Sequence, residues 1–322
     1  MGKANINNTA YEERLGTDRM LPLVLRMAMP SVAAQIVNLL YNLVDRIYIG
    51  HIPGIGTDAL AGIGVTGAII ILISAFSAIV SGGGAPLAAI ALGQGDRKRA
   101  GQTLGNGFVL LLIFTLLTTT LTYLFMEPLL MFTGASENTV GYAKDYLSIY
   151  LLGTLFVETS VGLNTFINTQ GRPAIAMYSV LIGAVLNIIL DPIFIFVMGM
   201  GVRGAALATV ISQACSALWI VSFLTSKRAS LRLEFRYMRP DRNVISHILA
   251  LGVSPFIMAS TESLVGFVLN SSLEKFGDIN VSALAIMQSA MLVVSVPLAG
   301  FAQGFVPIVS YNYGHGPNRH KA

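Results

Sequence analysis

The stretch QIVNLLYNLVDRIYIG, residues 35–50, is an apolar helix that carries a row of polar side chains. The steps from Gln35 to Asn38, Asn42 and Asp45 are three, four and three residues, so all four side chains share one helical face. A carboxylate near the centre of a bilayer costs about 2.5–3.5 kcal/mol on insertion scales and usually faces a cavity or a partner. This helix therefore predicts a membrane protein with a polar interior.

The composition agrees with that prediction. Of 322 residues, 54% are hydrophobic and only 11% are charged. Apolar runs recur along the chain, and about 20 helical residues cross a hydrocarbon layer roughly 30 Å thick. The single cysteine, Cys215, excludes an internal disulfide and a cysteine-rich metal site. We predict an all-α polytopic membrane protein whose first helix stays as an anchor.

Eight membrane helices are expected from the long apolar runs. They lie near residues 22–49, 59–92, 104–126, 146–169, 174–200, 204–225, 244–270 and 281–312. An even number places both termini on one side, and sixteen of the twenty Lys and Arg residues fall there. The positive-inside rule puts that side in the cytoplasm. The distribution of these basic residues indicates the membrane topology of the chain. We therefore expect no nucleic acid partner.

An internal repeat divides the chain. The segment ALAGIGVTGAII from Ala59 resembles ALAIMQSAMLVV from Ala283, and the upstream alignment places Asp45 on Asn270. We expect a six-helix lobe over 1–226, a cytoplasmic linker over 227–243 and the first two helices of a second lobe over 244–322. Such parallel repeats are typical of secondary transporters. By repeat symmetry about four helices are missing, so we interpret the chain as truncated after helix 8.

Further polar residues lie inside the predicted helices. Asn187 and Asp191 are four residues apart on one face of the fifth helix, and Pro192 interrupts its hydrogen bonding. Thr209 lies on the next helix, an antiparallel neighbour, although a lone membrane threonine often bonds its own backbone. Glu158 is a single acid among small and apolar residues. Asn38 and Asn42 fit interhelical hydrogen bonding as well as function.

Enzyme chemistry is not expected. The glycine-rich SGGGAP, residues 81–86, lacks the Lys-Ser/Thr pair of a phosphate cradle, so it predicts a bend and no nucleotide site. All four histidines lie near predicted interfaces, which leaves no buried imidazole cluster for catalysis. We predict no enzyme and no cofactor.

The run QGRPAIAMYSVLIGAVLNIILDPIF, which starts at Gln170, resembles the multidrug and toxic compound extrusion (MATE) transporters. The first helix and the loop GQGDRKRA, residues 93–100, are also similar to that family, closest to its bacterial MepA-like branch. The resemblance implies twelve helices in two lobes. It also implies a monomer in the bacterial plasma membrane that exports organic cations or amphipathic toxic compounds in exchange for Na⁺ or H⁺, without ATP.

The same resemblance assigns candidate sites. It implies a cation site, with Na⁺ as a candidate metal, formed by Asp45, Asn187, Asp191 and Thr209. Glu262 matches approximately a helix-7 acid used for coupling or drug binding. With it we place three further candidates for substrate or coupling contacts, Gln35, Asn42 and Glu158.

Two alternatives remain open. A flippase of lipid-linked precursors would need cations in the cavity, and the candidates are acidic. A channel or an inert membrane scaffold would use the polar faces only for packing.

Overall fold

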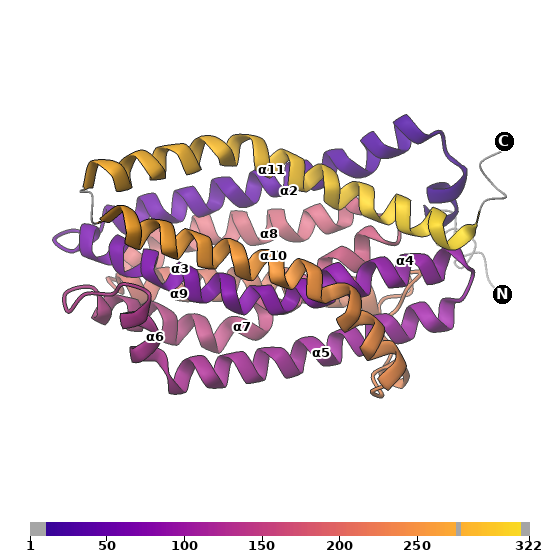
Figure 1. Ribbon diagram of the computed structural model, residues 1–322, viewed down its shortest axis with the longest axis horizontal. Helices are drawn as coiled ribbons and strands as arrows, with labels where there is room; N and C mark the ends of the chain where they lie inside the picture. Colours follow the sequence, from indigo (N-terminus) through magenta and orange to yellow (C-terminus); the bar gives the residue numbers. More distant parts are fainter. Residues whose placement is uncertain (1–10, 275–277, 317–322) are drawn as a thin grey trace.

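The computed structural model describes residues 11–274 and 278–316, and every regular element in those ranges is a helix (Figure 1). The long elements are α2 (Met20–Gly50), α3 (Gly56–Ile79), α5 (Arg97–Leu124), α7 (Val140–Asn168), α8 (Pro173–Pro192), α9 (Val202–Thr225), α10 (Arg242–Glu274) and α11 (Asp278–His315). Short elements are the π-helices η1 (Val80–Gly84) and η2 (Ile193–Val197), the α-helices α4 (Ala85–Gly93) and α6 (Met126–Phe132), and the 3₁₀-helix η3 (Phe235–Tyr237). Eight segments are long and apolar enough to cross a membrane, which confirms the polytopic fold.

Helix boundaries differ from the prediction where charged residues extend a helix beyond its apolar part. α5 begins at Arg97 and not near residue 104, because the Asp96 side chain caps it by accepting a hydrogen bond from the Arg99 backbone N–H at 2.9 Å. α7 begins at Val140 and not near residue 146. The short helix α6 was not expected at all. Apolar runs therefore locate the spans but not their polar first turns.

The predicted irregularities in two helices take the form of π-helical turns. The SGGGAP segment overlaps η1, which joins α3 to α4 without a break in the helix. Pro192 is followed directly by η2. A π-turn lengthens the hydrogen-bonded ring and often marks a functional position. Both irregularities lie next to polar side chains described below.

The helices run roughly along one common axis, and the described chain begins and ends at the same end of the bundle, here called the terminal end (Figure 1). α11 lies beside α2, and α10 lies beside α3. Glycines let the backbones touch: a Cβ on Gly83 would collide with the Ile248 carbonyl, and one on Gly252 would collide with the Ile79 carbonyl. α10 is thereby packed tightly against α3 and η1 in the terminal half.

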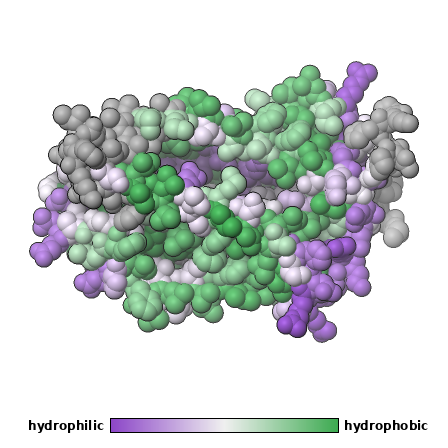
Figure 2. Space-filling model, viewed as in Figure 1, coloured by the Kyte–Doolittle hydropathy of each residue, from purple (hydrophilic) through white to green (hydrophobic). Residues whose placement is uncertain are grey.

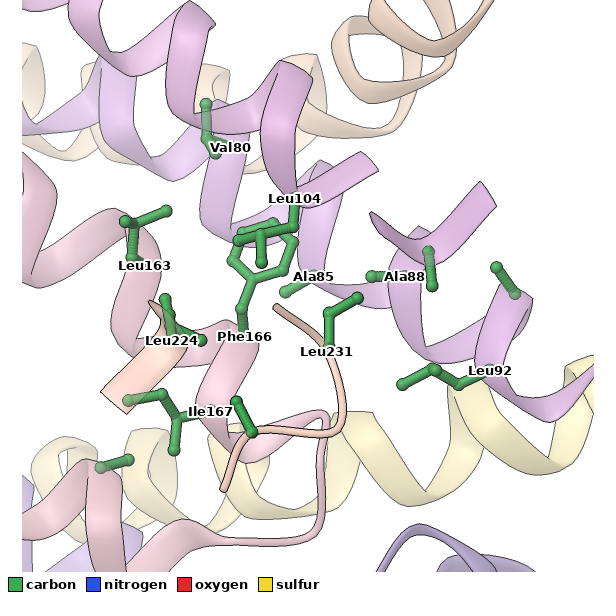
Figure 3. Packing of buried hydrophobic residues seen from close by; sticks show 14 of the residues in the cluster. Val80, Ala85, Ala88, Leu92, Leu104, Leu163, Phe166, Ile167, Leu224 and Leu231 are labelled. Atoms are coloured by element: carbon green, nitrogen blue, oxygen red, sulfur yellow. The ribbon is translucent and has the colours of Figure 1, made fainter. Parts of the chain in front are cut away.

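A buried apolar cluster fills the terminal half around Phe166, which is fully buried (Figure 3). Leu104 of α5 and Leu163 of α7 lie near its ring in the same cluster. Leu231, from the segment that joins α9 to α10, also belongs to this cluster and is only 2% exposed. The Gln170 Oε1 atom accepts a hydrogen bond from the Leu231 N–H at 3.2 Å. The segment predicted as a linker is thus packed against the bundle.

A short helix over residues 11–17 lies at the terminal end and contacts both parts of the chain. Its buried Glu12 forms a salt bridge of 2.9 Å with Arg97 at the start of α5. Asn312 of α11 donates a hydrogen bond of 2.8 Å to the Leu15 carbonyl. Burial raises the pKa of the Glu12 carboxyl, and the Arg97 charge opposes that rise. The helix therefore ties α5 to α11.

The glycine contacts lead to a stability prediction. Gly83→Val and Gly252→Val should each destabilise the protein by about 1–3 kcal/mol, because the new side chain overpacks a backbone contact. Gly64→Val is the matched control, since nothing lies within 4 Å of a Cβ there. Thermal unfolding in detergent measures the effect. Equal melting temperatures for all three variants would contradict close packing between α3 and α10.

Candidate cation site and cavity

A cavity of about 420 Å³ lies inside the bundle, walled by α2, α3, α7, α8, α9 and α11. Its polar lining includes Gln35, Asn38, Asn42, Asp45, Ser74, Tyr146, Thr209, Gln213 and Gln303. In the space-filling view a hydrophilic recess opens within the hydrophobic belt (Figure 2). The polar face of α2 thus meets the cavity, as its spacing predicted.

Asn187 and Asp191 lie one helical turn apart on α8 and are 2% and 0% exposed. The Asn187 Nδ2 group donates hydrogen bonds to Asp191 Oδ1 at 3.2 Å and to Thr209 Oγ1 at 3.4 Å. The Asp45 carboxyl group comes within hydrogen-bonding reach of Asp191. The structure therefore brings together all four residues proposed for the cation site, from α2, α8 and α9.

Three acceptor oxygens of this cluster lack a hydrogen-bond partner although they are buried. They are Asp45 Oδ1, Asn187 Oδ1 and Asp191 Oδ2. An unpaired buried polar atom costs on the order of 1–3 kcal/mol, so such groups call for an explanation. A bound cation would satisfy all three at once, and the oxygen-only donor set suits a hard ion such as Na⁺. A proton shared between the carboxyl groups would satisfy two of them.

Apolar side chains separate this cluster from the end of the bundle opposite the termini. Ile49 of α2, Ile195 of η2 and Val202 of α9 are each no more than 4% exposed and belong to one buried cluster. Asp45 and Thr209, in contrast, line the cavity. The four-residue cluster is therefore reached from the cavity.

Glu158 forms a second, separate polar contact. It is 2% exposed on α7, and its Oε1 atom accepts a hydrogen bond from the Ser74 hydroxyl at 3.1 Å. Ser77 also lies within hydrogen-bonding reach of this carboxyl group. Both serines lie on α3 in the two turns before η1. Glu158 thus fixes α7 to α3 just ahead of the π-helical turn.

The remaining candidates have different environments. The Asn42 side chain donates to the Asn38 carbonyl at 2.7 Å, a bond within its own helix and not between helices. Gln35 Nε2 donates to Gln303 Oε1 at 3.2 Å and so joins α2 to α11. Glu262 is exposed on α10 and is not among the residues that line the cavity. The structure therefore does not bring Glu262 to the site.

Gln303 and Tyr146 are among the residues of the site that were not singled out from the sequence. Gln303 is an uncharged amide in an apolar helix, and that polarity was the available signal. Tyr146 lines the cavity, stacks on Tyr150 with ring centroids 6.1 Å apart, and comes within hydrogen-bonding reach of Thr209. A tyrosine near a helix start resembles an ordinary interfacial aromatic residue, so no sequence pattern distinguishes it.

Fold and site together define a polytopic helical membrane protein with a polar internal cavity. The sequence profile of the MatE family matches residues 30–193. The multidrug export protein MepA of Staphylococcus haemolyticus (strain JCSC1435) is 26% identical over 298 residues, which are 92% of this chain and 66% of that protein. The chain belongs to the MatE family, within its MepA-like branch.

Solved structures agree on the fold. A crystal structure of a MATE protein in complex with MaD3S superposes with a TM-score of 0.86 at 26% identity, covering 94% of this chain and 68% of that one. The outward-facing conformation of a multidrug resistance MATE family transporter gives 0.82 at 27% identity, covering 91% of this chain and 65% of that one. The chain spans just under two thirds of the length of the curated relative named above.

The contact between Glu158 and Ser74 can be measured by a double-mutant cycle. Glu158→Leu and Ser74→Ala, alone and together, should give a coupling free energy of about 0.6–1.7 kcal/mol, the range found for hydrogen bonds between membrane helices. Unfolding in detergent provides the free energies. Ser148→Ala, whose hydroxyl bonds only the Asp145 carbonyl of its own helix, is the uncoupled control. Strictly additive effects of Glu158→Leu and Ser74→Ala would contradict the contact.

Proposed function

We propose that this chain forms the transport core of a secondary antiporter. The antiporter exports organic cations or amphipathic toxic compounds in exchange for Na⁺ or H⁺. The observation that carries the proposal is the pair Asp45 and Asp191, two acids with unpartnered buried oxygens, of which Asp45 lines a polar cavity and Asp191 is buried behind it. The names of the relatives as multidrug export proteins support the substrate class.

Exchange follows if the organic cation and the coupling ion, Na⁺ or H⁺, bind to the same negative charge. An organic cation in the cavity is attracted by the ionised Asp45, which lines it. Na⁺ or H⁺ bound between Asp45 and Asp191 neutralises one negative charge of the pair and so weakens the hold on the substrate. A ligand shifts a conformational equilibrium only by its differential affinity for the two states. The carboxyl pair supplies this difference in affinity between the two states. The exchange therefore needs no ATP.

The direction of transport rests on the distribution of charge. The basic residues gather at the terminal end, which the positive-inside rule places in the cytoplasm of a bacterial plasma membrane. The helices are closely packed at that end through glycines such as Gly83 and Gly252. This arrangement corresponds to a state closed toward the cytoplasm. The cavity lies within a single chain, so a monomer suffices.

A flippase for lipid-linked precursors is less well supported. Its phosphate-bearing substrates call for several cations in the cavity. Arg46 is the one basic residue lining the cavity in the described part of the chain. Asp45 lines the same cavity, and Asp191 and Glu158 are buried in the surrounding helices. These surroundings favour positively charged substrates.

Efflux measurements test the proposal directly. In cells that express the gene at its full encoded length, Asp45→Asn and Asp191→Asn should each abolish gradient-driven export of ethidium, because an amide carries no charge to exchange. Asp58→Asn, an exposed acid in the first turn of α3, is the matched control and should export at the parental rate. If both site variants exported ethidium at the parental rate and were equally abundant, the proposal would be wrong.

A further inference from the structure

A hollow of about 470 Å³ lies at the terminal end, where α5 and α10 begin. Its polar lining consists of Asp96, Lys98, Arg99, Gln102, Thr103, Asn243 and His247, and Leu87 and Val244 add an apolar wall. The hollow is separate from the transport cavity, with which it shares no lining residue.

The acids near this hollow are engaged in helix caps. Asp96 accepts a hydrogen bond from the Arg99 N–H at 2.9 Å, and Asp241 accepts one from the Asn243 N–H at 2.9 Å. Lys98 and Arg99, in contrast, form no salt bridge with any residue of the described ranges. Lys98 and Arg99 outnumber Asp96 among the lining residues, so the hollow carries a net positive charge, next to the positive end of the α5 dipole.

A second hollow of about 400 Å³ continues this surface through the shared residue Gln102. Its charged lining consists of three arginines, Arg236, Arg239 and Arg242, and one acid, Asp241. Glu234 pairs with Arg236 at 2.6 Å, while the other two arginines have no salt bridge in the described part of the chain. We call the two hollows together the basic shelf. It belongs to the strongly hydrophilic region at the lower right of the space-filling view (Figure 2).

The basic shelf borders the apolar belt of the protein. Beyond it along α10, Leu251, Val253 and Ile257 are exposed, and along α5, Ile113 and Leu116 are exposed. These two helices are neighbours at the terminal end. A ligand that fits both surfaces carries a negative headgroup and long apolar chains.

We propose that the basic shelf binds the phosphate of an anionic phospholipid whose acyl chains lie along α5 and α10. Basic pockets between membrane helices at the cytoplasmic side are suited to such headgroups. The lipid would contact α5, one of the first six membrane helices, through Lys98 and Arg99. It would contact α10, the seventh, through Arg242 and His247. It would therefore bridge the two lobes.

Lipid binding to the purified chain tests this proposal. A fluorescent phosphatidylglycerol is titrated into the detergent-solubilised protein, with phosphatidylcholine of the same chain length as the comparison. We expect at least about tenfold tighter binding of phosphatidylglycerol, since each basic residue near an anionic lipid contributes about fivefold. The double variant Lys98→Gln/Arg99→Gln should lose about 25-fold in that affinity on the same basis.

Two controls distinguish a specific lipid site from a general effect of surface charge. Arg19→Gln/Arg26→Gln removes two exposed cations from the same end outside the shelf and should leave binding near the parental value. The charge-preserving Lys98→Arg/Arg99→Lys variant should also bind, which shows that the site folds. Equal losses in both glutamine variants, or equal binding of the two lipids, would overturn the proposal.

A competition measurement distinguishes binding of the lipid from binding of a free phosphate. Inorganic phosphate and glycerol phosphate at millimolar concentration should displace the fluorescent lipid only weakly, because they lack the acyl chains that contact α5 and α10. If either displaces it with an affinity equal to that of the whole lipid, the shelf is a soluble-anion site and the lipid assignment is wrong.

Discussion

The close approach of two acids, Asp45 and Asp191, in an apolar bundle is the constraint on which the structure depends. Each ionised carboxylate costs about 2.5–3.5 kcal/mol on membrane insertion scales, and two like charges in contact add to that cost. Asn187 offsets part of it through one amide that donates to both Asp191 and Thr209. The remaining oxygens stay unpartnered, which supports the proposal that a cation binds here.

α2 links this site to the rest of the molecule. Asp45 lies in its distal half, Gln35 bonds Gln303 of α11 near the middle, and Ala28 packs against Gly304 of α11 in the terminal half. Pro30 lies inside the helix and removes one backbone hydrogen bond there. A change at the carboxyl pair would therefore act on a helix that lacks one backbone hydrogen bond at Pro30 and is in close contact with α11.

Much of the site could be predicted from the sequence because helical periodicity fixes which residues share a face. The steps along α2, and the four-residue spacing of Asn187 and Asp191, both predicted side chains that meet inside the bundle, and the structure brings them together. The family resemblance added Thr209, which spacing alone favoured as structural. Which cation occupies the cluster remains a prediction.

The rest depends on contacts between distant segments that periodicity does not report. The partner of Gln35 lies on α11, and Asn42 proved to bond its own helix and not a neighbour. Glu262, proposed for coupling or drug contacts, is exposed on α10 and does not line the cavity, and its role stays a prediction. The polar segment before α10 was predicted to be a linker, and it packs against the bundle through the buried Leu231, which the average polarity of the segment does not reveal.

The central claim is that Asp45 and Asp191 hold the cation that an organic cation displaces. Its most direct test follows bound ²²Na⁺ and released H⁺ together while ethidium is added to the purified protein in detergent. The parental chain should release one of the two ions in proportion to ethidium bound, and the Asp45→Asn/Asp191→Asn variant should release neither. Equal release from the double variant would contradict the account.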